Sequence, residues 1–275
     1  LEGKKVRIVF PEAYDERVLE AAVKLSATSY VQPVLVGKKE KVEELAQPLF
    51  LNVSGIEFVD HENYEKYDEM VAKFVERRAG KVNEEKAREL LQDVNYFGTM
   101  LVYLGEVEGL VSGAIHSTGD TVRPALQIIK TKPGVSRTSG AFIMSRNASR
   151  FIFADCAINT SIDAQGLAEI AVESAKTAKA FNINPKVAML SFSTYGSAKT
   201  EETLKVAEAT RLVREKAPTL PVGGEMQFDA AYVPPVAKLK APNSEIQGDA
   251  NVFVFPSLEA GNIGYKIEES LGGFE

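Results

Sequence analysis

The segment HSTGDTVRP concentrates side chains that are well suited to binding an anion. It follows an apolar run that predicts a buried strand, and it leads into a helical pattern. Ser117, Thr118 and Thr121 supply hydroxyl groups, and a helix N-terminus adds unpaired N–H groups and the positive end of the helix dipole. Arg123 adds a guanidinium that can hold a phosphate through two hydrogen bonds. We therefore predict a phosphate site here.

A purely structural interpretation of the same segment stays open. Asp120 could cap the helix while Arg123 pairs with a surface carboxylate. His116 lies at the end of the predicted strand, and a single histidine in such a place is more often a packed residue than a catalytic acid or base.

A second loop of this type follows the apolar run VAML and precedes another helical pattern. It contains Ser193, Thr194, Gly196 and Ser197, so it repeats the combination of hydroxyl groups and a helix start. Such residues often do no more than cap a helix. Neither loop matches the P-loop pattern GxxxxGK[ST] or the dinucleotide pattern GxGxxG, so neither carries a nucleotide fingerprint.

Three further stretches carry polar side chains that could meet a ligand. Arg137 lies in the glycine-flanked loop KTKPGVSRTSG, and Asn262 follows the apolar run VFVF. In GGEMQFDAA, the spacing of Glu225, Gln227 and Asp229 is that of a strand, which would turn all three to one face. We expect a site or an interface at that face, with a solvated edge as the alternative.

The composition is that of a globular protein and narrows the classes of partner. The 275 residues include 32 Lys and Arg against 38 Asp and Glu, for a net charge of −6, without a dense basic cluster for nucleic acid. Anionic substrates would therefore need a local group of donors. No apolar run approaches the roughly 20 residues that span a bilayer, and the first residues carry no signal peptide, so we expect a cytoplasmic protein without membrane partners.

The few cysteines and histidines exclude several kinds of site. One cysteine, Cys156, cannot form an internal disulfide, and its apolar surroundings predict a small buried side chain. Two histidines and one cysteine are too few for a typical zinc site, so no metal is expected. The chain also lacks the GxSxG motif of serine hydrolases.

Strand-like runs alternate with helical patterns along most of the chain. This βαβ rhythm predicts the α/β class, with mostly parallel sheets that helices cover on both faces. Three successive helical patterns over residues 62–105 interrupt the rhythm, and two strands that follow TKPGVSRTSG are close enough to pair antiparallel. We predict two α/β/α lobes, residues 1–135 and 136–275, with a cleft between them that could bind a ligand.

Taken together, these segments resemble the phosphate acetyltransferase family. The resemblance runs from Val6 to Gly273 and is carried by FPEAYDERVLEAA, HSTGDTVRPALQIIK, FADCAIN, KVAMLSFSTYGSAK, GEMQFDAA and ANVFVFPSLEAGNIGYKI. It implies a fold like that of isocitrate and isopropylmalate dehydrogenases, and a homodimer. Coenzyme A, acetyl-CoA and phosphate would be substrates, and no tightly bound cofactor is implied.

The resemblance also implies a mechanism. The thiolate of coenzyme A attacks the carbonyl of acetyl phosphate, donors stabilise the tetrahedral oxyanion, and phosphate leaves. By motif, Ser117, Thr118 and Arg123 would line the acetyl phosphate side. Arg78 in FVERRAGK matches an arginine that the family associates with coenzyme A. The other residues expected to bind substrate are Thr121, Arg137, Ser193, Thr194, Gly196, Ser197 and Asn262.

The sequence departs from the family pattern at two places. Tyr195 stands where the family usually has a lysine, which removes a positive charge from the second loop. The family also continues past LGGFE into a segment with a Ser-Arg-Gly motif and an aspartate that acts on the thiol. We expect a chain that ends at LGGFE to recognise its substrates better than it converts them.

Three other functions remain as alternatives. A dehydrogenase of the same fold would need a metal-binding aspartate cluster and a nucleotide loop, and the sequence has neither. A non-catalytic module that binds coenzyme A is possible because similar domains occur fused to malic enzymes. A phosphate butyryltransferase would differ only in the acyl chain that it accepts.

Overall fold

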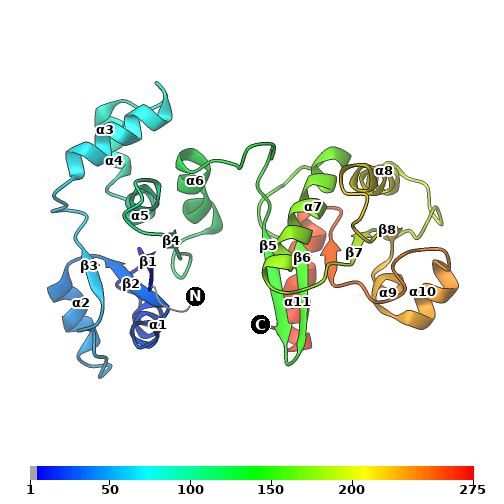
Figure 1. Ribbon diagram of the computed structural model, residues 1–275, viewed down its shortest axis with the longest axis horizontal. Helices are drawn as coiled ribbons and strands as arrows, with labels where there is room; N and C mark the ends of the chain where they lie inside the picture. Colours follow the sequence, from blue (N-terminus) through cyan, green and yellow to red (C-terminus); the bar gives the residue numbers. More distant parts are fainter. Residues whose placement is uncertain (1–4) are drawn as a thin grey trace. The chain divides into compact units, whose positions relative to one another are not determined.

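The computed structural model describes residues 5–275, which form two compact units (Figure 1). The first unit extends to Lys130 and the second begins at Thr131. Both combine a β-sheet with helices, so the predicted α/β class is confirmed. The boundary predicted from the sequence, after residue 135, falls in the same loop.

The first unit contains a four-stranded parallel sheet in the order β3-β2-β1-β4. Strand β1 pairs with both β2 and β4, so the loops that follow β1 and β4 leave the same edge of the sheet. Those two loops contribute to the site described below. The strands are β1 Val6–Phe10, β2 Val31–Val36, β3 Glu57–Val59 and β4 Gly109–Leu110.

The described part of this unit has six helices, and the predicted helical insertion is confirmed as α3, α4 and α5 in succession. Asp15 caps α1, because its carboxylate accepts hydrogen bonds from the N–H groups of Arg17 and Val18. Leu19 and Ala22 on that helix are buried against the sheet. The helices are α1 Glu16–Ser26, α2 Lys39–Ala46, α3 Tyr67–Arg78, α4 Glu84–Leu90, α5 Val94–Tyr103 and α6 Thr118–Ile128.

The second unit contains a five-stranded sheet in the order β5-β6-β9-β7-β8. Strands β5 and β6 form the predicted antiparallel hairpin, and the other neighbours pair in parallel. The strands are β5 Ala141–Arg146, β6 Ser149–Ala154, β7 Val187–Leu190, β8 Val222–Met226 and β9 Val252–Val254, and the helices are α7 Ala164–Ala180, α8 Glu201–Lys216, α9 Phe228–Tyr232, α10 Pro234–Lys240 and α11 Leu258–Gly272.

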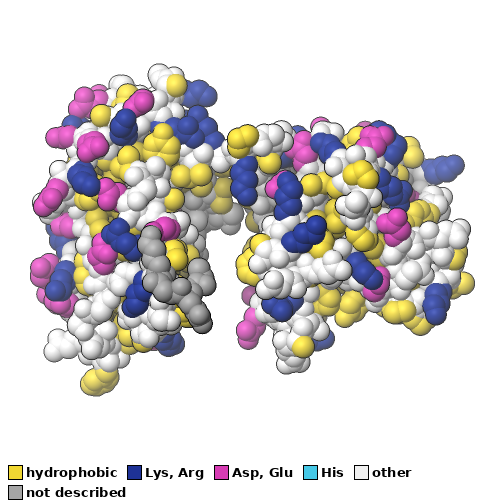
Figure 2. Space-filling view, in the orientation of Figure 1, with side chains coloured by type: hydrophobic (Ala, Val, Ile, Leu, Met, Phe, Trp, Pro, Cys, Tyr) yellow, Lys and Arg dark blue, Asp and Glu magenta, His cyan; other side chains and the backbone are white. Residues whose placement is uncertain are grey.

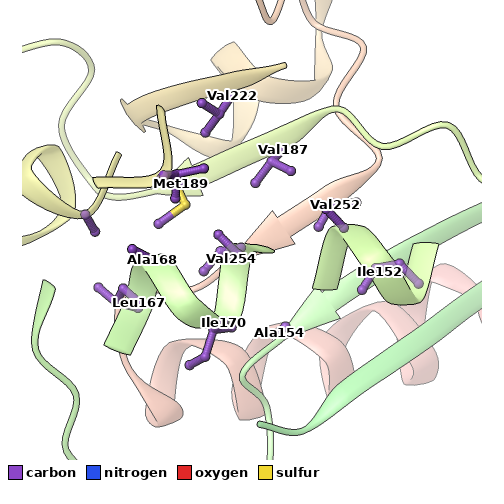
Figure 3. Close-up of a cluster of buried hydrophobic side chains, with 14 of the residues drawn as sticks. Ile152, Ala154, Leu167, Ala168, Ile170, Val187, Met189, Val222, Val252 and Val254 are labelled. Atoms are coloured by element: carbon purple, nitrogen blue, oxygen red, sulfur yellow. The ribbon is translucent and has the colours of Figure 1, made fainter. Parts of the chain in front are cut away.

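The central strands of this sheet are buried on both faces, which explains their continuous apolar runs. Helices α7 and α8 pack on one face, and their buried residues form one cluster with the strands (Figure 3). Cys156, just beyond β6, is fully buried as predicted. The labelled members of the cluster in Figure 3 include Ile152, Leu167, Ile170, Met189 and Val254.

Helix α6 begins earlier than the sequence pattern predicts. We expected HSTGDTVRP to lie between a strand and a helix, but β4 already ends at Leu110 and α6 begins at Thr118, inside that segment. Ser117 is the N-cap, because its hydroxyl accepts the N–H of Asp120. The prediction that Asp120 could be the capping residue is therefore wrong, and Asp120 lies inside the first turn.

The prediction that Glu225, Gln227 and Asp229 share one face of a strand is also wrong. Strand β8 ends at Met226, Gln227 is the N-cap of α9, and Asp229 belongs to that helix. The β-strand period therefore does not continue beyond Met226. Of these three residues, only Glu225 lies in the strand and is buried.

Among the glycines of this unit, Gly261 in α11 leaves the least space for a side chain. A Cβ at this position would lie 2.3 Å from the main-chain oxygen of Asp155. We expect Gly261→Ala to lower the free energy of unfolding by about 2 kcal/mol or more, because packed backbone must move. Chemical denaturation of the variant measures this. Gly55→Ala is the control, since its Cβ would only touch Ser26 at 3.6 Å; equal stability of the two variants would contradict the prediction.

Candidate functional site

The N-terminal turn of α6 has free hydrogen-bond donors. Ser117 accepts the N–H of Asp120 through its hydroxyl and the N–H of Thr121 through its carbonyl. Within the part of the chain that the structure describes, the N–H groups of Thr118 and Gly119 have no partner. Two main-chain donors and the positive end of the helix dipole are therefore available to an anion.

The guanidinium of Arg123 lies at the same end of the helix. A Cβ placed on Gly119 would be 3.7 Å from an Nη of Arg123 and 3.8 Å from the Ser117 hydroxyl, so these groups lie around one position. Arg123 also forms an ion pair of 3.3 Å with Asp120, whose other oxygen accepts the Ser117 hydroxyl. The side chain of Arg123 is 57% exposed, so it can leave Asp120 for a stronger anionic partner.

Thr121 lies in the first turn of α6, whereas Arg78 reaches that helix from the end of α3. The Thr121 hydroxyl is buried and has no partner among the described residues, so it is not engaged in the fold. Arg78 donates to the carbonyl of Gln127, near the C-terminal end of the helix. Burial raises the pKa of the Tyr96 phenol, while the positive charges of Arg123 and Arg78 act against that shift, which places both arginines near Tyr96.

A residue that the sequence analysis did not single out shapes the loop before α6. Glu12, directly after β1, accepts hydrogen bonds from four consecutive main-chain N–H groups, those of Gly113 to His116, at 2.8 to 3.1 Å. His116 Nδ1 lies 2.7 Å from the same carboxylate. Burial alone would raise the pKa of Glu12, but these hydrogen bonds outweigh it and lower the pKa to about 2.

The second unit has a hollow of about 900 Å³ at the carboxyl end of its parallel strands. Loops that follow β6, β7 and β9 line it, together with the N-terminal half of α8 and the start of α11. This edge is where open α/β sheets commonly bind ligands. Its polar lining residues are Asn159, Thr160, Ser161, Asp163, Ser191, Glu201, Glu202, Lys205, Glu208 and Ser257.

Asp155 organises the loop that borders this hollow. Its buried carboxylate accepts the main-chain N–H groups of Gly140, Ala157, Ile158 and Asn159, and also the side-chain amide of Asn159. The start of this loop, from Ala157 to Asn159, is therefore held by the side chain that directly follows β6. This carboxylate was not identified from the sequence either.

Asn262 and Arg137 both lie beside that loop. Asn262 donates to the carbonyl of Cys156 at 3.1 Å. Arg137 lies 3.6 Å from the carboxylate of Asp163, which caps α7, and it packs against Gly166 in the same turn. Arg137 therefore contacts a residue that lines the hollow, whereas Asn262 contacts Cys156, which lies outside the lining.

The loop after β7 uses many of its donors internally. Ser193 is fully buried and its hydroxyl donates to Glu225 at 3.0 Å, while the N–H of Gly196 donates to the same carboxylate oxygen at 2.6 Å. The Ser197 hydroxyl accepts the N–H of Thr194, which is also buried. Contact of these four residues with a substrate stays a prediction. What they visibly do is stabilise the loop next to Ser191, in the wall of the hollow.

The described residues hold neither a metal site nor a membrane span. Among residues 5–275, no group of three or more His, Cys, Asp or Glu is arranged to hold a metal ion. Over the same range, no helix is both long and apolar enough to cross a membrane. On the visible surface of each unit, basic side chains are interspersed with acidic ones (Figure 2).

Comparison with known proteins identifies the family. The chain matches the family described as phosphate acetyl/butaryl transferase over residues 1–275. It is 61% identical to a phosphate acetyltransferase of Bacillus subtilis, over 99% of this chain and 84% of the relative, and 62% identical to one of Staphylococcus aureus, over 100% and 85%.

Solved structures agree. A phosphotransacetylase from Staphylococcus aureus superposes with a TM-score of 0.91 at 62% identity, covering 100% of this chain and 84% of that one. One from Streptococcus pyogenes gives 0.93 at 53% identity, covering 99% and 84%. A branched-chain phosphotransacylase from Enterococcus faecalis, at 17% identity and a TM-score of 0.64, shares the fold. The chain belongs to the phosphate acetyl/butaryl transferase family.

Proposed function

We propose that this chain catalyses the reversible transfer of an acetyl group between coenzyme A and inorganic phosphate. The observation that carries the proposal is the identity of 61 to 62% with curated phosphate acetyltransferases over at least 99% of the chain. The family includes transferases of longer acyl groups, but the relatives at this identity are named for acetyl. The chain is accordingly an acyltransferase.

The reaction needs no covalent enzyme intermediate. The sulfur of coenzyme A, as a thiolate, forms a bond to the carbonyl carbon of acetyl phosphate, and the carbonyl oxygen becomes an oxyanion. When the carbon–oxygen bond to phosphate breaks, its electron pair leaves with phosphate and acetyl-CoA remains. Donors already aimed at the oxyanion and at the leaving phosphate lower the barrier.

We assign the phosphate-binding part to the N-terminal turn of α6. The free N–H groups of Thr118 and Gly119 and the guanidinium of Arg123 converge there, and they supply main-chain donors and one full positive charge. Ser117 and Thr118 add exposed hydroxyl groups. To bind a phosphate, Arg123 must break its ion pair with Asp120 and pair with the substrate instead, because a carboxylate next to a phosphate oxygen repels it.

The remaining predicted residues serve coenzyme A in this proposal. Arg78 donates to the carbonyl of Gln127 on α6, so it adds a second positive charge to the same unit. Arg137 contacts Asp163 in the lining of the second unit's hollow, the loop of Ser193 to Ser197 follows its lining residues Ser191 and Phe192, and Asn262 holds Cys156 just before the loop that lines it. The hollow of about 900 Å³ has room for part of a large substrate, and because Asp163, Glu201, Glu202 and Glu208 line it against Lys205 alone, we assign it to an uncharged part of coenzyme A rather than to its phosphates.

We further propose a homodimer in the cytoplasm, with coenzyme A and phosphate as substrates and no tightly bound cofactor. The family resemblance supports the dimer. So do apolar side chains of α11 that are more than half exposed at helical spacing, namely Ile263, Ile267 and Leu271. Sedimentation velocity tests the dimer; a single monomer boundary at micromolar concentration contradicts it.

An assay of thioester formation tests the activity. Acetyl phosphate and coenzyme A are mixed with the protein, and acetyl-CoA is followed by the ultraviolet absorbance of its thioester. We expect turnover, with kcat/KM for acetyl phosphate at least about 10-fold above that for butyryl phosphate, because a pocket discriminates added methylenes by this order. Binding of coenzyme A by calorimetry without any turnover would instead identify a non-catalytic binding module.

A further inference from the structure

The carboxylate of Glu12 occupies a pocket formed by main-chain donors. Oε2 accepts the N–H groups of Gly113 and Ala114 at 2.9 and 2.8 Å, and Oε1 accepts those of Ile115 and His116 at 2.9 and 3.1 Å. Consecutive N–H groups that point to one place form a nest for an anion. Here the anion belongs to the protein itself, since the Glu12 side chain is only 1% exposed.

This contact joins two loops at one edge of the sheet. Glu12 follows β1 and the four donors follow β4, which is the parallel neighbour of β1. Arg17 at the start of α1 adds a second connection, because its guanidinium donates to the carbonyl of Ala114 at 2.8 Å. The loop ends at Ser117, the N-cap of α6, so its shape fixes where the free N–H groups of Thr118 and Gly119 point.

The same contact determines the proton position on His116. An ionised carboxylate can only accept hydrogen bonds, so the Nδ1 atom 2.7 Å from Oε1 must carry the proton. In the neutral imidazole, Nε2 is then without a proton and is an acceptor. The ring is partly exposed, at 25%, so this acceptor belongs to a residue at the surface of the loop.

We propose that Glu12 is a positioning residue for the phosphate-binding turn of α6, which it holds in shape through the Gly113–His116 loop while fixing His116 as the Nδ1–H tautomer. The inference rests on the function proposed above, because it assigns Glu12 to the same site. Glu12 itself need not touch the substrate. Its contribution is that the loop is already ordered when the phosphate arrives.

Glu12→Gln is the decisive variant because it keeps the size of the side chain. A glutamine has one acceptor oxygen, and its NH₂ group would face two of the main-chain N–H groups. Glu16→Gln makes the same chemical change at an exposed position on α1 and is the matched control. Circular dichroism and thermal unfolding establish that each variant is folded before any comparison.

The first readout needs no turnover. The chain has two histidines, so ¹⁵N NMR of the imidazoles resolves His116, with His61→Gln for assignment. We expect neutral His116 to carry its proton on Nδ1 in the wild type and in Glu16→Gln, and on Nε2 in Glu12→Gln. An Nε2–H tautomer in the wild type overturns the proposal, even if Glu12→Gln does not fold.

The second readout is phosphate recognition. Inorganic phosphate titrated into ¹⁵N-labelled protein should shift the amide signals of Thr118 and Gly119, with Kd raised at least about 10-fold in Glu12→Gln. In the thioester assay we expect kcat/KM for acetyl phosphate to fall on the order of 10²-fold, since displacement by about 1 Å can cost that much. A folded Glu12→Gln with unchanged Kd and kcat/KM overturns the proposal. A wild type without turnover refutes the proposed function alone, because the tautomer and Kd still test Glu12.

Discussion

Replacing Arg123 by alanine is expected to lower kcat/KM for acetyl phosphate by about 10²–10³-fold. Arg123 is the one full positive charge at the N-terminal turn of α6 that we assign to the phosphate, and loss of one such donor from a reacting group costs about this much. Arg123→Lys should recover only part of the rate, because an ammonium keeps the charge without the planar pair of donors. Initial rates of thioester formation at varied acetyl phosphate measure both variants.

The control for Arg123→Ala is another exposed arginine of the first unit. Arg88 pairs with Asp68 and Glu84, and its side chain is 41% exposed, so Arg88→Ala removes the same charge away from α6. Its activity should stay within about threefold, since exposed ion pairs contribute little to stability. If both Arg123→Ala and Arg88→Ala keep kcat/KM within about threefold of the wild type, the phosphate is bound elsewhere.

Most of the fold could be predicted because it depends on local periodicity. The alternation of apolar runs and helical patterns gave the α/β class, the helical insertion and the β5–β6 hairpin. Starting points of helices were harder to predict. At α6 several residues can act as N-cap, and Ser117 does so because its backbone is extended, which the pattern of apolar residues does not encode.

The carboxylates that hold the loops could not be predicted in the same way. Glu12 and Asp155 follow strands directly, but the donors of Glu12 lie about 100 residues further along the chain. Glu225 binds Ser193 and Gly196 across two neighbouring strands. Such contacts depend on which strands become neighbours, so composition and spacing alone do not reveal them. A carboxylate placed directly after an apolar strand is the signal that could have suggested the first two.

Tyr195 shows how a departure from the family pattern can be accommodated. Its hydroxyl donates to Ser244 at 2.8 Å and accepts the N–H of Gly224 at 3.2 Å. Its backbone has a φ of +46°, the left-handed region that side chains other than glycine rarely adopt. Where the resemblance predicts a lysine, this chain therefore has a side chain that holds the loop in place. We infer that the loop of Ser193 to Ser197 contributes a fixed shape to the neighbouring hollow and no positive charge at residue 195.

The acid stability of the protein should depend strongly on Glu12. Its pKa of about 2 is below the ordinary value of 4.5, so the ionised carboxylate stabilises the folded state above pH 4.5, and this contribution is lost as the pH falls from 4.5 toward 2. At about 1.4 kcal/mol for each pKa unit, the contribution is about 3 kcal/mol. Urea unfolding of the wild type and of Glu12→Gln between pH 7 and pH 3 measures it.

The difference between the two proteins is more informative than either curve, because Asp15, Asp60 and Asp249 also have lowered pKa values and make any variant less stable in acid. Glu12→Gln leaves those groups in place, so the wild type should lose its advantage over the variant progressively below pH 4.5. Glu16→Gln should follow the wild-type curve. A wild-type advantage that is the same at pH 7 and pH 3 would mean that the charge of Glu12 does not hold the loop. The lower stability of Glu12→Gln would then come from the shape of the amide and its lost hydrogen bonds, not from the lost charge.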